Sequence, residues 1–245
     1  FFKKAGTLGF DEKILRNKEI ILAVDSKSWR KNLFEIYKAN RKKDPNEQHI
    51  WDFYYNYVHD FLEEIKENMN WSIIKSDMSE ADDVIAVLLQ KEFNTENDIN
   101  VVVSADKDFK QFLDFKNLKC KVYIYDPLKE MFLEKEENVL LKMILMGDKS
   151  DNIPSVKPKI GPKTAEKIIK ENQLNELMKN VDFQTNFNTN KKLISLHLED
   201  IPEFVINTIT KEYKRTKMIP SVNQITSLMF LKSFNQEVDD FLNLI

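Results

Sequence analysis

The sequence predicts an α/β fold in which a parallel sheet flanked by helices is followed by an all-helical region. Apolar, β-branched runs alternate with helical patterns in the first half of the chain. This alternation is typical of a parallel sheet, because parallel strands need long crossover connections. After about residue 135 the patterns are helical and no convincing strand follows. We therefore expect two parts, residues 1–135 and residues 136–245.

Four segments are expected to form the strands, because each is short, apolar and rich in β-branched or aromatic residues. They are "EIILAVD" (19–25), "WSIIKSD" (71–77), "INVVVSAD" (99–106) and "CKVYIYD" (120–126). The last one alternates polar and apolar residues, so we expect it nearer an edge of the sheet. Helical patterns lie between the strands, at 50–69 and 80–93. Since sites in parallel sheets form at the carboxyl ends of strands, acidic residues at these ends are candidates for function.

The second part is expected to consist of helices joined by loops. Helical patterns cover residues 136–148, 161–172, 201–215 and 222–245. The polar, Asn-rich stretch 180–192 is predicted to be a loop. We find no internal repeat and no low-complexity segment.

The overall composition is that of a folded globular protein. Hydrophobic residues make up 42% of the chain and charged residues 31%, which excludes a disordered protein. The single cysteine, Cys120, excludes an internal disulfide framework and fits a reducing compartment such as the cytoplasm. No apolar run approaches the length of a membrane span and no signal peptide is visible, so no membrane association is expected. The chain begins "FFKKAGTLGF", which we interpret as a chain entered partway through.

Charge is nearly balanced overall but is distributed unevenly. The net charge of −3, from 37 basic and 40 acidic residues, is not that of a globally basic nucleic-acid-binding protein. The stretch 27–43 nevertheless has seven basic residues and one acidic residue, and 157–170 has a similar basic excess. The acids gather in a few short motifs. This segregation predicts a cation site beside surfaces that bind phosphates.

Three carboxylates, Glu80, Asp82 and Asp83, crowd the start of the helix predicted at 80–93. Ser79 and Asp82 fit a capping box, and acidic residues suit the positive end of a helix. A cap uses one carboxylate and the helix dipole a second, so three exceed what the helix needs.

Further carboxylates stand at the ends of predicted elements: Asp25, Asp106, Asp108, Asp148 and Asp151. Taken singly, each group is explained by a turn or a helix cap. Taken together, eight carboxylates brought to one end of a sheet would repel one another unless cations lay among them. Oxygen ligands alone favour Mg²⁺ or Mn²⁺. The histidines lie outside these motifs, which argues against zinc, and residues 106–117 lack the glycine and glutamate of a calcium loop.

Basic residues supply the other half of the expected site. Lys38 and Arg41, in "YKANR", follow Asp25 closely enough to reach over a cation site, although a solvated helix face explains them equally well. Gly161 precedes Pro162 at a helix start, where a glycine lets a backbone approach a phosphate and helix N–H groups point at it.

Lys163, Lys167 and Lys170 then repeat at helical spacing along one face of that helix. An ordinary Gly-Pro helix start would explain this segment without any ligand. The preceding "GDKSDNIPSV" favours a clamp on a phosphate backbone.

Taken in order, these motifs resemble the flap endonuclease / 5′→3′ exonuclease family, with the nearest likeness to the bacteriophage branch whose replication enzyme is called ribonuclease H. The motifs are "VD…YKANR", "EADDVIAV", "VVVSADKDF" and "MGDKSDNIPSV…IGPKTA". The likeness spans nearly the whole chain. Its most specific part is the ordered series E-A-D-D, D-x-D and G-D-x-x-D-N.

The resemblance implies a PIN-like nuclease domain joined to a helical domain whose helix–three-turn–helix element grips duplex DNA, often with a bound potassium ion. Lys38 and Arg41 would face the scissile phosphate. The metal-site acids would be Asp25, Glu80, Asp82, Asp83, Asp106, Asp108, Asp148 and Asp151. The DNA-binding residues would be Arg30, Lys42, Gly161, Lys163, Thr164 and Lys167.

The function implied is a structure-specific 5′ nuclease that removes RNA primers and 5′ flaps in phage-type DNA replication. Two Mg²⁺ or Mn²⁺ ions about 4 Å apart would activate a water and steady the leaving oxygen. The implied substrates are branched or nicked duplex DNA and RNA–DNA hybrids with 5′ ends. A polymerase or a single-stranded-DNA-binding protein is the implied partner, and we expect a monomer in the host cytoplasm if a phage encodes it.

Two departures from the family pattern qualify these expectations. Family members begin with one more strand that carries a further metal-site aspartate, whereas "FFKKAGTLGF" already matches the segment before the second strand. We therefore expect a fragment that lacks one strand and one ligand. The bridge 42–50 is also short, so a long helical arch over a threaded 5′ end is not expected.

Two other functions fit part of the pattern. The D-x-D and G-D-x-x-D motifs suit a haloacid-dehalogenase-type phosphatase, but that class needs a strand where "NVLLKMILMGD" predicts a helix. A catalytically incomplete fragment that only binds branched DNA is the other alternative.

Overall fold

The computed structural model describes residues 19–41, 48–68 and 71–217, and all that follows concerns these residues. Lys42 and the helix predicted at 222–245 lie outside them, as does the segment before residue 19. In the described part of the chain, no helix is both long and apolar enough to cross a membrane.

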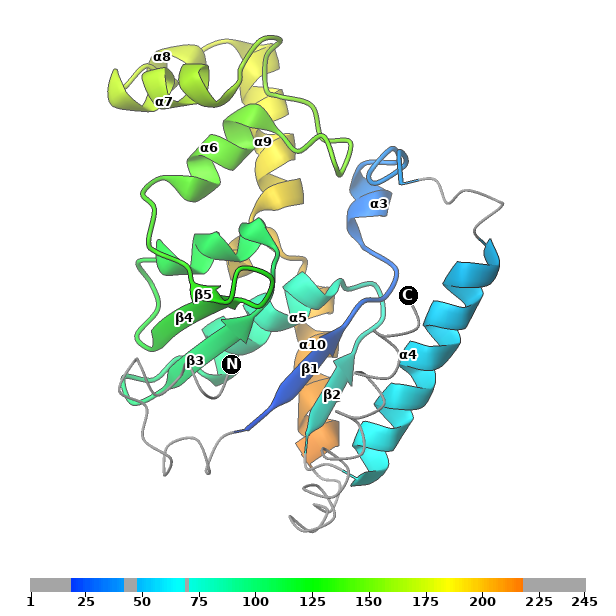
Figure 1. Ribbon diagram of the computed structural model, residues 1–245. Coiled ribbons are helices and arrows are strands. Elements are labelled where there is room, and N and C mark those ends of the chain that lie inside the picture. The colour runs from blue at the N-terminus through cyan, green and yellow to red at the C-terminus, as the bar shows by residue number, and fades with distance from the viewer. Residues whose placement is uncertain (1–18, 42–47, 69–70, 218–245) are drawn as a thin grey trace.

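The strands form two small sheets side by side (Figure 1). In the first, β1 (Ile21–Val24) pairs with β2 (Ser72–Lys75) in parallel. In the second, β3 (Ile99–Val103) pairs in parallel with β4 (Lys121–Asp126), which also pairs with the short antiparallel β5 (Met131–Phe132). The parallel α/β prediction is confirmed.

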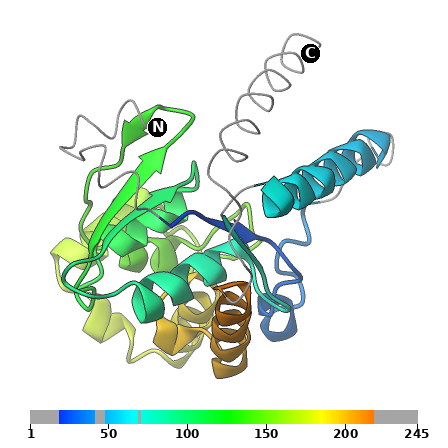
Figure 2. The same ribbon diagram turned by 90° about the horizontal axis from the view of Figure 1, so that it is seen from below.

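The helices connect and follow the strands. They are α3 (Arg30–Leu33), α4 (Gln48–Asn68), α5 (Ala81–Val87), α6 (Val139–Met146), α7 (Pro162–Lys170), α8 (Leu174–Leu177), α9 (Val181–Ile194) and α10 (Glu203–Lys217). A π-helical stretch (Leu88–Glu92) extends α5, and 3₁₀ helices span Lys107–Leu113 and Leu198–Asp200. Helix α4 lies on the β2 side of the molecule, away from β3–β5 (Figures 1 and 2).

The strand 120–126 was expected nearer an edge of the sheet. The two-residue β5, which the sequence analysis missed, pairs with it only at Tyr125 and Asp126, so most of its outer side has no strand partner among the described residues.

One local prediction was wrong, because the capping box at the start of α5 is shifted by one residue. Asp83, not Asp82, accepts the backbone N–H of the N-cap residue Glu80 at 3.0 Å, while the Ser79 hydroxyl donates to the Ser76 carbonyl at 2.7 Å. Asp82 is therefore free of any role in the cap.

The Asn-rich stretch 180–192 was predicted to be a loop and instead forms most of α9. Asn180 caps the helix by accepting the N–H of Phe183 at 2.9 Å. Asn186 donates to the Val156 carbonyl at 3.0 Å, and Asn190 donates to the Pro154 carbonyl at 2.8 Å. These amides bind the backbone of the neighbouring loop, so part of the polarity of this segment serves to satisfy partly buried carbonyl groups.

The core joins the two predicted parts of the chain. Val205, Ile209 and Tyr213 of α10 belong to the same buried cluster as Ile74 of β2 and Val84 of α5. Helices α6, α7 and α9 share a second cluster. The division at residue 135 remains a prediction about domains, but the last described helix returns to pack on the α/β part (Figure 1).

Three polar side chains of the α/β part bind the backbone at the end of α9, and we call this contact the seam. Arg30 donates to the Leu193 carbonyl at 2.8 Å. The fully buried Gln111 donates to the Ile194 carbonyl and accepts the Leu196 N–H, both at 3.1 Å. Gln90 donates to the Leu196 carbonyl at 2.7 Å. The seam therefore satisfies backbone groups that have left the α9 hydrogen-bond ladder.

Gln111 should be a large contributor to stability. Replacing it with Leu leaves the Ile194 carbonyl and the Leu196 N–H buried without partners, which costs about 2–4 kcal/mol of unfolding free energy. Urea denaturation followed by circular dichroism measures this loss. The exposed Gln184→Leu change is the matched control and should stay within about 0.5 kcal/mol of wild type. Equal effects of the two substitutions would contradict the seam.

Candidate active site

The predicted site residues lie just beyond the strands and helices that precede them. Asp25 directly follows β1, and Glu80, Asp82 and Asp83 open α5. Asp106 is the N-cap of the 3₁₀ helix after β3, where its carboxylate accepts the N–H of Asp108 at 2.8 Å. The Asp25 carboxylate accepts the N–H of Ala81 at 2.8 Å, which fixes the end of β1 against the start of α5.

Arg30 forms the centre of a buried ionic network beside this site. Its side chain donates to Glu80 and to the Oδ2 atom of Asp83, each at 2.9 Å, and forms an ion pair with Asp83 Oδ1 at the same distance. Burial alone would lower the pKa of Arg30, but the adjacent Asp83 and Glu80 carboxylates raise it above its usual range. Only 2% of Arg30 is exposed, so it cannot lie on a DNA-facing surface. The expectation that Arg30 binds DNA is therefore corrected: it holds acids in place.

Glu80 and Asp83 are occupied by protein partners. Glu80 accepts from Ser28 at 2.9 Å and from Tyr37 at 3.0 Å, besides its bonds from Arg30 and Lys38. Burial would raise the pKa of Glu80, but the Arg30 and Lys38 charges hold it below its usual range. Asp83 is completely buried. In this arrangement both acids organise the network around Arg30.

Four other acids line one small polar cavity: Asp82, Asp108, Asp148 and Asp151. Burial, followed by repulsion from Asp106, raises the pKa of Asp82 to about 7. The same two causes, in the same order, raise the pKa of Asp108 to about 7. Elements far apart in the sequence thus bring carboxylates close enough to disfavour each other's ionisation.

Gly147 shapes the turn that brings Asp148 and Asp151 to this cavity. Its backbone has φ +68°, and a Cβ atom there would meet the Ile153 carbonyl oxygen at 2.4 Å, so only glycine fits. The Asp148 carbonyl accepts the Ile153 N–H at 2.7 Å across the turn. Burial would raise the pKa of Asp148, but bonds from Ser150 and Lys107 keep it below its ordinary value.

The predicted basic pair, Lys38 and Arg41, lies next to the acids. Lys38 pairs with Glu80 and lies 3.8 Å from Asp151, and Arg41 pairs with Asp151. Two residues that the sequence analysis missed join them. The buried Tyr37 hydroxyl bridges Glu80 and Asp151, at 3.0 and 3.2 Å.

The second missed residue is Lys107, which pairs with Asp148 at 3.1 Å. Both missed residues lie inside motifs that were singled out, "YKANR" and "SADKDF". Their position in those motifs was the one available signal.

The donor set fits hard divalent cations. All the candidate ligand atoms are carboxylate oxygens, and the buried Asp108 Oδ1 has no hydrogen-bond partner. A cation would satisfy this oxygen and would relieve the repulsion that raises the pKa values of Asp82 and Asp108. Among the described side chains, no three acids, histidines or cysteines already stand in ligand geometry. Binding of a cation would therefore require these side chains to move.

The predicted DNA clamp forms a separate exposed feature at the start of α7. Gly161 is the N-cap and Pro162 the first helical residue, as the sequence predicts. A Cβ atom at Gly161 would meet no atom within 4 Å, so nothing inside the protein requires glycine there. Lys163, Thr164 and Lys167 are exposed on this helix. The open space at Gly161 suits the approach of an outside group.

Comparison with known proteins identifies the class to which this fold and site belong. Residues 9–143 match the family described as 5′-3′ exonuclease, N-terminal resolvase-like domain, and residues 135–227 match 5′-3′ exonuclease, C-terminal SAM fold. The chain belongs to the 5′-3′ exonuclease family.

Curated relatives come from phages and bacteria. The chain is 34% identical over 160 residues to ribonuclease H of Enterobacteria phage T4, covering 63% of this chain and 50% of that protein. It is 36% identical over 166 residues to DNA polymerase I of Caldicellulosiruptor bescii, covering 62% of this chain and 18% of the polymerase. A 5′-3′ exonuclease of Buchnera aphidicola subsp. Schizaphis graminum is 31% identical over 210 residues, with 83% and 67% covered. The chain thus spans half or less of the first two relatives.

Solved structures share the fold. The bacteriophage T5 flap endonuclease in a complex with DNA and metal ions is 20% identical, with a TM-score of 0.62 over 87% of this chain and 88% of that one. The T5 5′-exonuclease with bound zinc ions has the same TM-score and covers 90% of its own length. These similarities support the α/β domain followed by a helical domain.

The raised pKa of Asp82 predicts a pH-dependent stability. Its folded pKa of about 7 lies above the ordinary aspartate value, so its contribution to stability is complete at acid pH and is lost as pH rises through 7. At pH 8 without divalent ions, Asp82→Asn should therefore be more stable than wild type by up to about 4 kcal/mol, because each pKa unit is worth about 1.4 kcal/mol. Near pH 4 the difference should vanish.

Thermal and urea unfolding between pH 4 and 8 measure this difference. Asp182→Asn, on the exposed start of α9, is the matched control and should follow the wild-type profile. A constant Asp82→Asn effect across this range would show that ionisation is not the cause.

Proposed function

We propose that this chain forms the nuclease part of a structure-specific 5′ nuclease, which hydrolyses phosphodiesters at 5′ ends and flaps of branched DNA. The observation that carries the proposal is the cavity lined by Asp82, Asp108, Asp148 and Asp151 in a member of the 5′-3′ exonuclease family. Crowded carboxylates with raised pKa values at the end of a parallel sheet suit cation binding more than structural packing.

In the proposed mechanism, Mg²⁺ or Mn²⁺ ions would be held by Asp82, Asp106, Asp108 and Asp148. Bound there, two divalent ions would supply an activated water and neutralise the leaving oxygen. Asp25 lies at the same edge and is retained as a candidate ligand. Glu80 and Asp83 act through Arg30, as positioning residues for the start of α5.

Lys38 and Arg41 are proposed to bind the scissile phosphate. In the free protein, Lys38 pairs with Glu80 and Arg41 pairs with Asp151. These ion pairs keep both basic side chains next to the acids of the site. A phosphate that displaced these carboxylates would receive charge-assisted hydrogen bonds from both side chains. Asp151 therefore acts here as a partner of the basic pair, and as a candidate ligand once they turn away.

The start of α7 is proposed to bind the duplex backbone. Gly161, Lys163, Thr164 and Lys167 offer an open approach, a hydroxyl and positive charge, which suit phosphates and not base edges. Cleavage should therefore follow the shape of the DNA and not its sequence. A potassium ion at this clamp, a preference for RNA–DNA hybrids, a monomeric state and polymerase or single-strand-binding partners remain proposals.

Neither alternative gains support. The phosphatase class needs a strand where α6 is helical, and it leaves the clamp unexplained. The binding-only fragment shares every residue discussed above, so an experiment must separate it from a nuclease.

Cleavage of a 5′-labelled flap duplex by the full-length protein tests the proposed function. We expect hydrolysis with Mg²⁺ and none with EDTA. Asp148→Asn should slow cleavage by at least about 100-fold, because it removes a charge from the cation site. Flap binding in Ca²⁺ should persist, and Asp182→Asn is the matched control. Binding without cleavage by the wild type would establish the binding-only alternative, and metal-independent cleavage would refute the proposal.

The clamp predicts a salt-dependent affinity. Lys163→Ala should weaken duplex binding uniformly across sequences and reduce the slope of log affinity against log salt by about 1. Fluorescence anisotropy between 50 and 200 mM KCl, roughly the range in which phosphate contacts dominate, measures this slope. Lys119→Ala, in the exposed turn before β4, is the control and should leave the slope unchanged. An identical slope for Lys163→Ala would exclude Lys163 from the clamp.

A further inference from the structure

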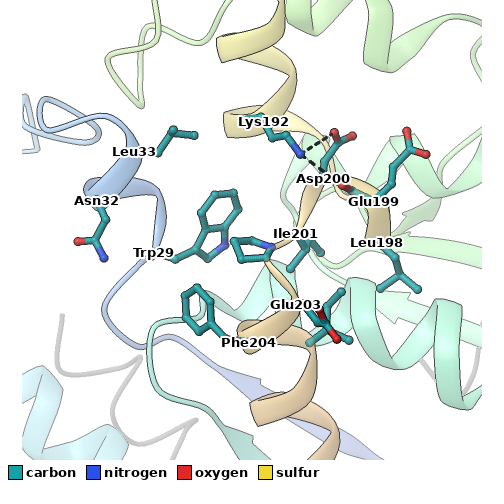
Figure 3. A pocket seen from close by; sticks show the side chains of 12 residues that line it. Trp29, Asn32, Leu33, Lys192, Leu198, Glu199, Asp200, Ile201, Glu203 and Phe204 are labelled. Atoms are coloured by element: carbon teal, nitrogen blue, oxygen red, sulfur yellow. Dashed lines mark hydrogen bonds and ion pairs between the residues drawn. The ribbon is translucent and has the colours of Figure 1, made fainter.

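A second pocket, unrelated to the acid cavity, lies between α3 and the start of α10. It encloses about 710 Å³ and shares no lining residue with the cavity that holds the acids. Trp29, Asn32 and Leu33 line it from the α3 side, and Lys192 and residues 198–206 line it from the other side (Figure 3). None of the predicted metal, catalytic or DNA-binding residues takes part.

We propose that this pocket binds a short segment of a partner protein, in extended conformation, whose bulky apolar side chain stands beside a lysine or arginine. The proposal does not depend on the nuclease function. Three features of the pocket carry it: an exposed apolar strip, two buried polar atoms without partners, and an acidic rim.

The apolar strip would receive the bulky side chain. Leu33 is 51% exposed and Phe204 is 53% exposed. Figure 3 shows these two side chains on opposite sides of Trp29, which is itself buried. Exposed apolar side chains that are gathered around a pocket are typical of a binding surface, whereas single scattered ones are not. An aliphatic or aromatic anchor would cover all three side chains.

The two unpaired atoms specify the main chain of the ligand. Trp29 Nε1 is a buried donor with no acceptor, and Asp200 Oδ2 is a buried acceptor with no donor. Each such group carries a cost of about 1–3 kcal/mol, so pairs of this kind are rare in a finished interior. Because both atoms are buried, the two side chains would have to turn toward the pocket to meet a ligand. An extended peptide then presents both groups that are needed, a carbonyl for the indole N–H and an N–H for the carboxylate.

The rim selects positive charge. Glu199, Asp200 and Glu203 line the pocket against one lysine, Lys192, which lies 3.6 Å from Asp200. Glu199 and Asp200 also pair with Lys191, at 2.9 and 3.4 Å. Glu203 is exposed and forms no ion pair with any described residue. A lysine or arginine beside the anchor would give Glu203 a partner, whereas a nucleic-acid phosphate would be repelled.

Selection from a displayed library of random decapeptides tests this proposal, with full-length wild-type protein as bait. Counter-selection uses the double variant Glu203→Lys, Phe204→Ser, in which the exposed rim and strip are altered. We expect enriched sequences to share an aromatic or aliphatic residue next to lysine or arginine. Enrichment of acidic sequences would overturn the proposal. No enrichment over the counter-selection would also overturn it, and this is the result expected if the chain itself fills the pocket.

Titration of the enriched synthetic peptides then separates the acidic rim from the apolar strip. Tryptophan fluorescence should change on binding, and Glu203→Lys and Phe204→Ser should each weaken affinity by about tenfold, as expected for loss of one anchor or charge contact. Leu128→Ser, at a turn residue that is 83% exposed, and Glu137→Lys are the matched controls and should bind as wild type. Equal weakening by the controls would refute the pocket as the binding site.

The flap-cleavage rate of the same variants is measured in parallel. It should be unchanged in Glu203→Lys and Phe204→Ser, because neither residue belongs to the proposed nuclease machinery. The peptide-binding proposal and the nuclease proposal can therefore fail independently of each other. A variant that still cleaves the flap but no longer binds the peptide must be folded, so its loss of binding is not caused by unfolding.

Discussion

The buried contact of Arg30 with Glu80 and Asp83 is the interaction on which the rest of the site depends. It joins the α3 segment to the start of α5, and the same guanidinium holds the Leu193 carbonyl at the end of α9. Removing one member of such a network leaves a buried charge unpaired, which costs about 3–5 kcal/mol. Asp82 lies between Glu80 and Asp83 in the sequence, so this contact also holds the backbone from which Asp82 reaches the acid cavity.

The acids of the site divide by environment more than by sequence. Glu80 and Asp83 have cationic and hydroxyl partners, whereas Asp82 and Asp108 face other acids and have a pKa of about 7. Asp148 lies between these extremes, because Lys107 and Ser150 favour its charge. The cluster therefore contains two kinds of carboxylate. One kind is paired with basic or hydroxyl groups of the protein, and the other faces like charges, so that a bound cation would stabilise its ionised form.

The sequence predicted the four long strands, most helices and the gathering of the acids, since each depends on local periodicity and on where an element ends. It could not predict that Arg30 is buried. Arg30 stands in a basic stretch typical of a surface, and its partners lie 50 or more residues away. Helix α9 was missed for a related reason: Asn186 and Asn190 bind carbonyl groups of a distant loop, and composition alone does not distinguish this use of asparagine from a solvated turn.

The seam relies largely on Gln90 and Gln111, whose amides carry no charge at any ordinary pH. Ionic strength and pH change the interactions of carboxylates and lysines at the surface. They have little effect on a hydrogen bond between a neutral, buried amide and the backbone. Changes in salt or proton concentration would thus act on the acid cavity and on the exposed lysines more than on these amide contacts. The joint between the α/β part and the end of α9 should therefore keep its amide hydrogen bonds over a wide range of salt and pH.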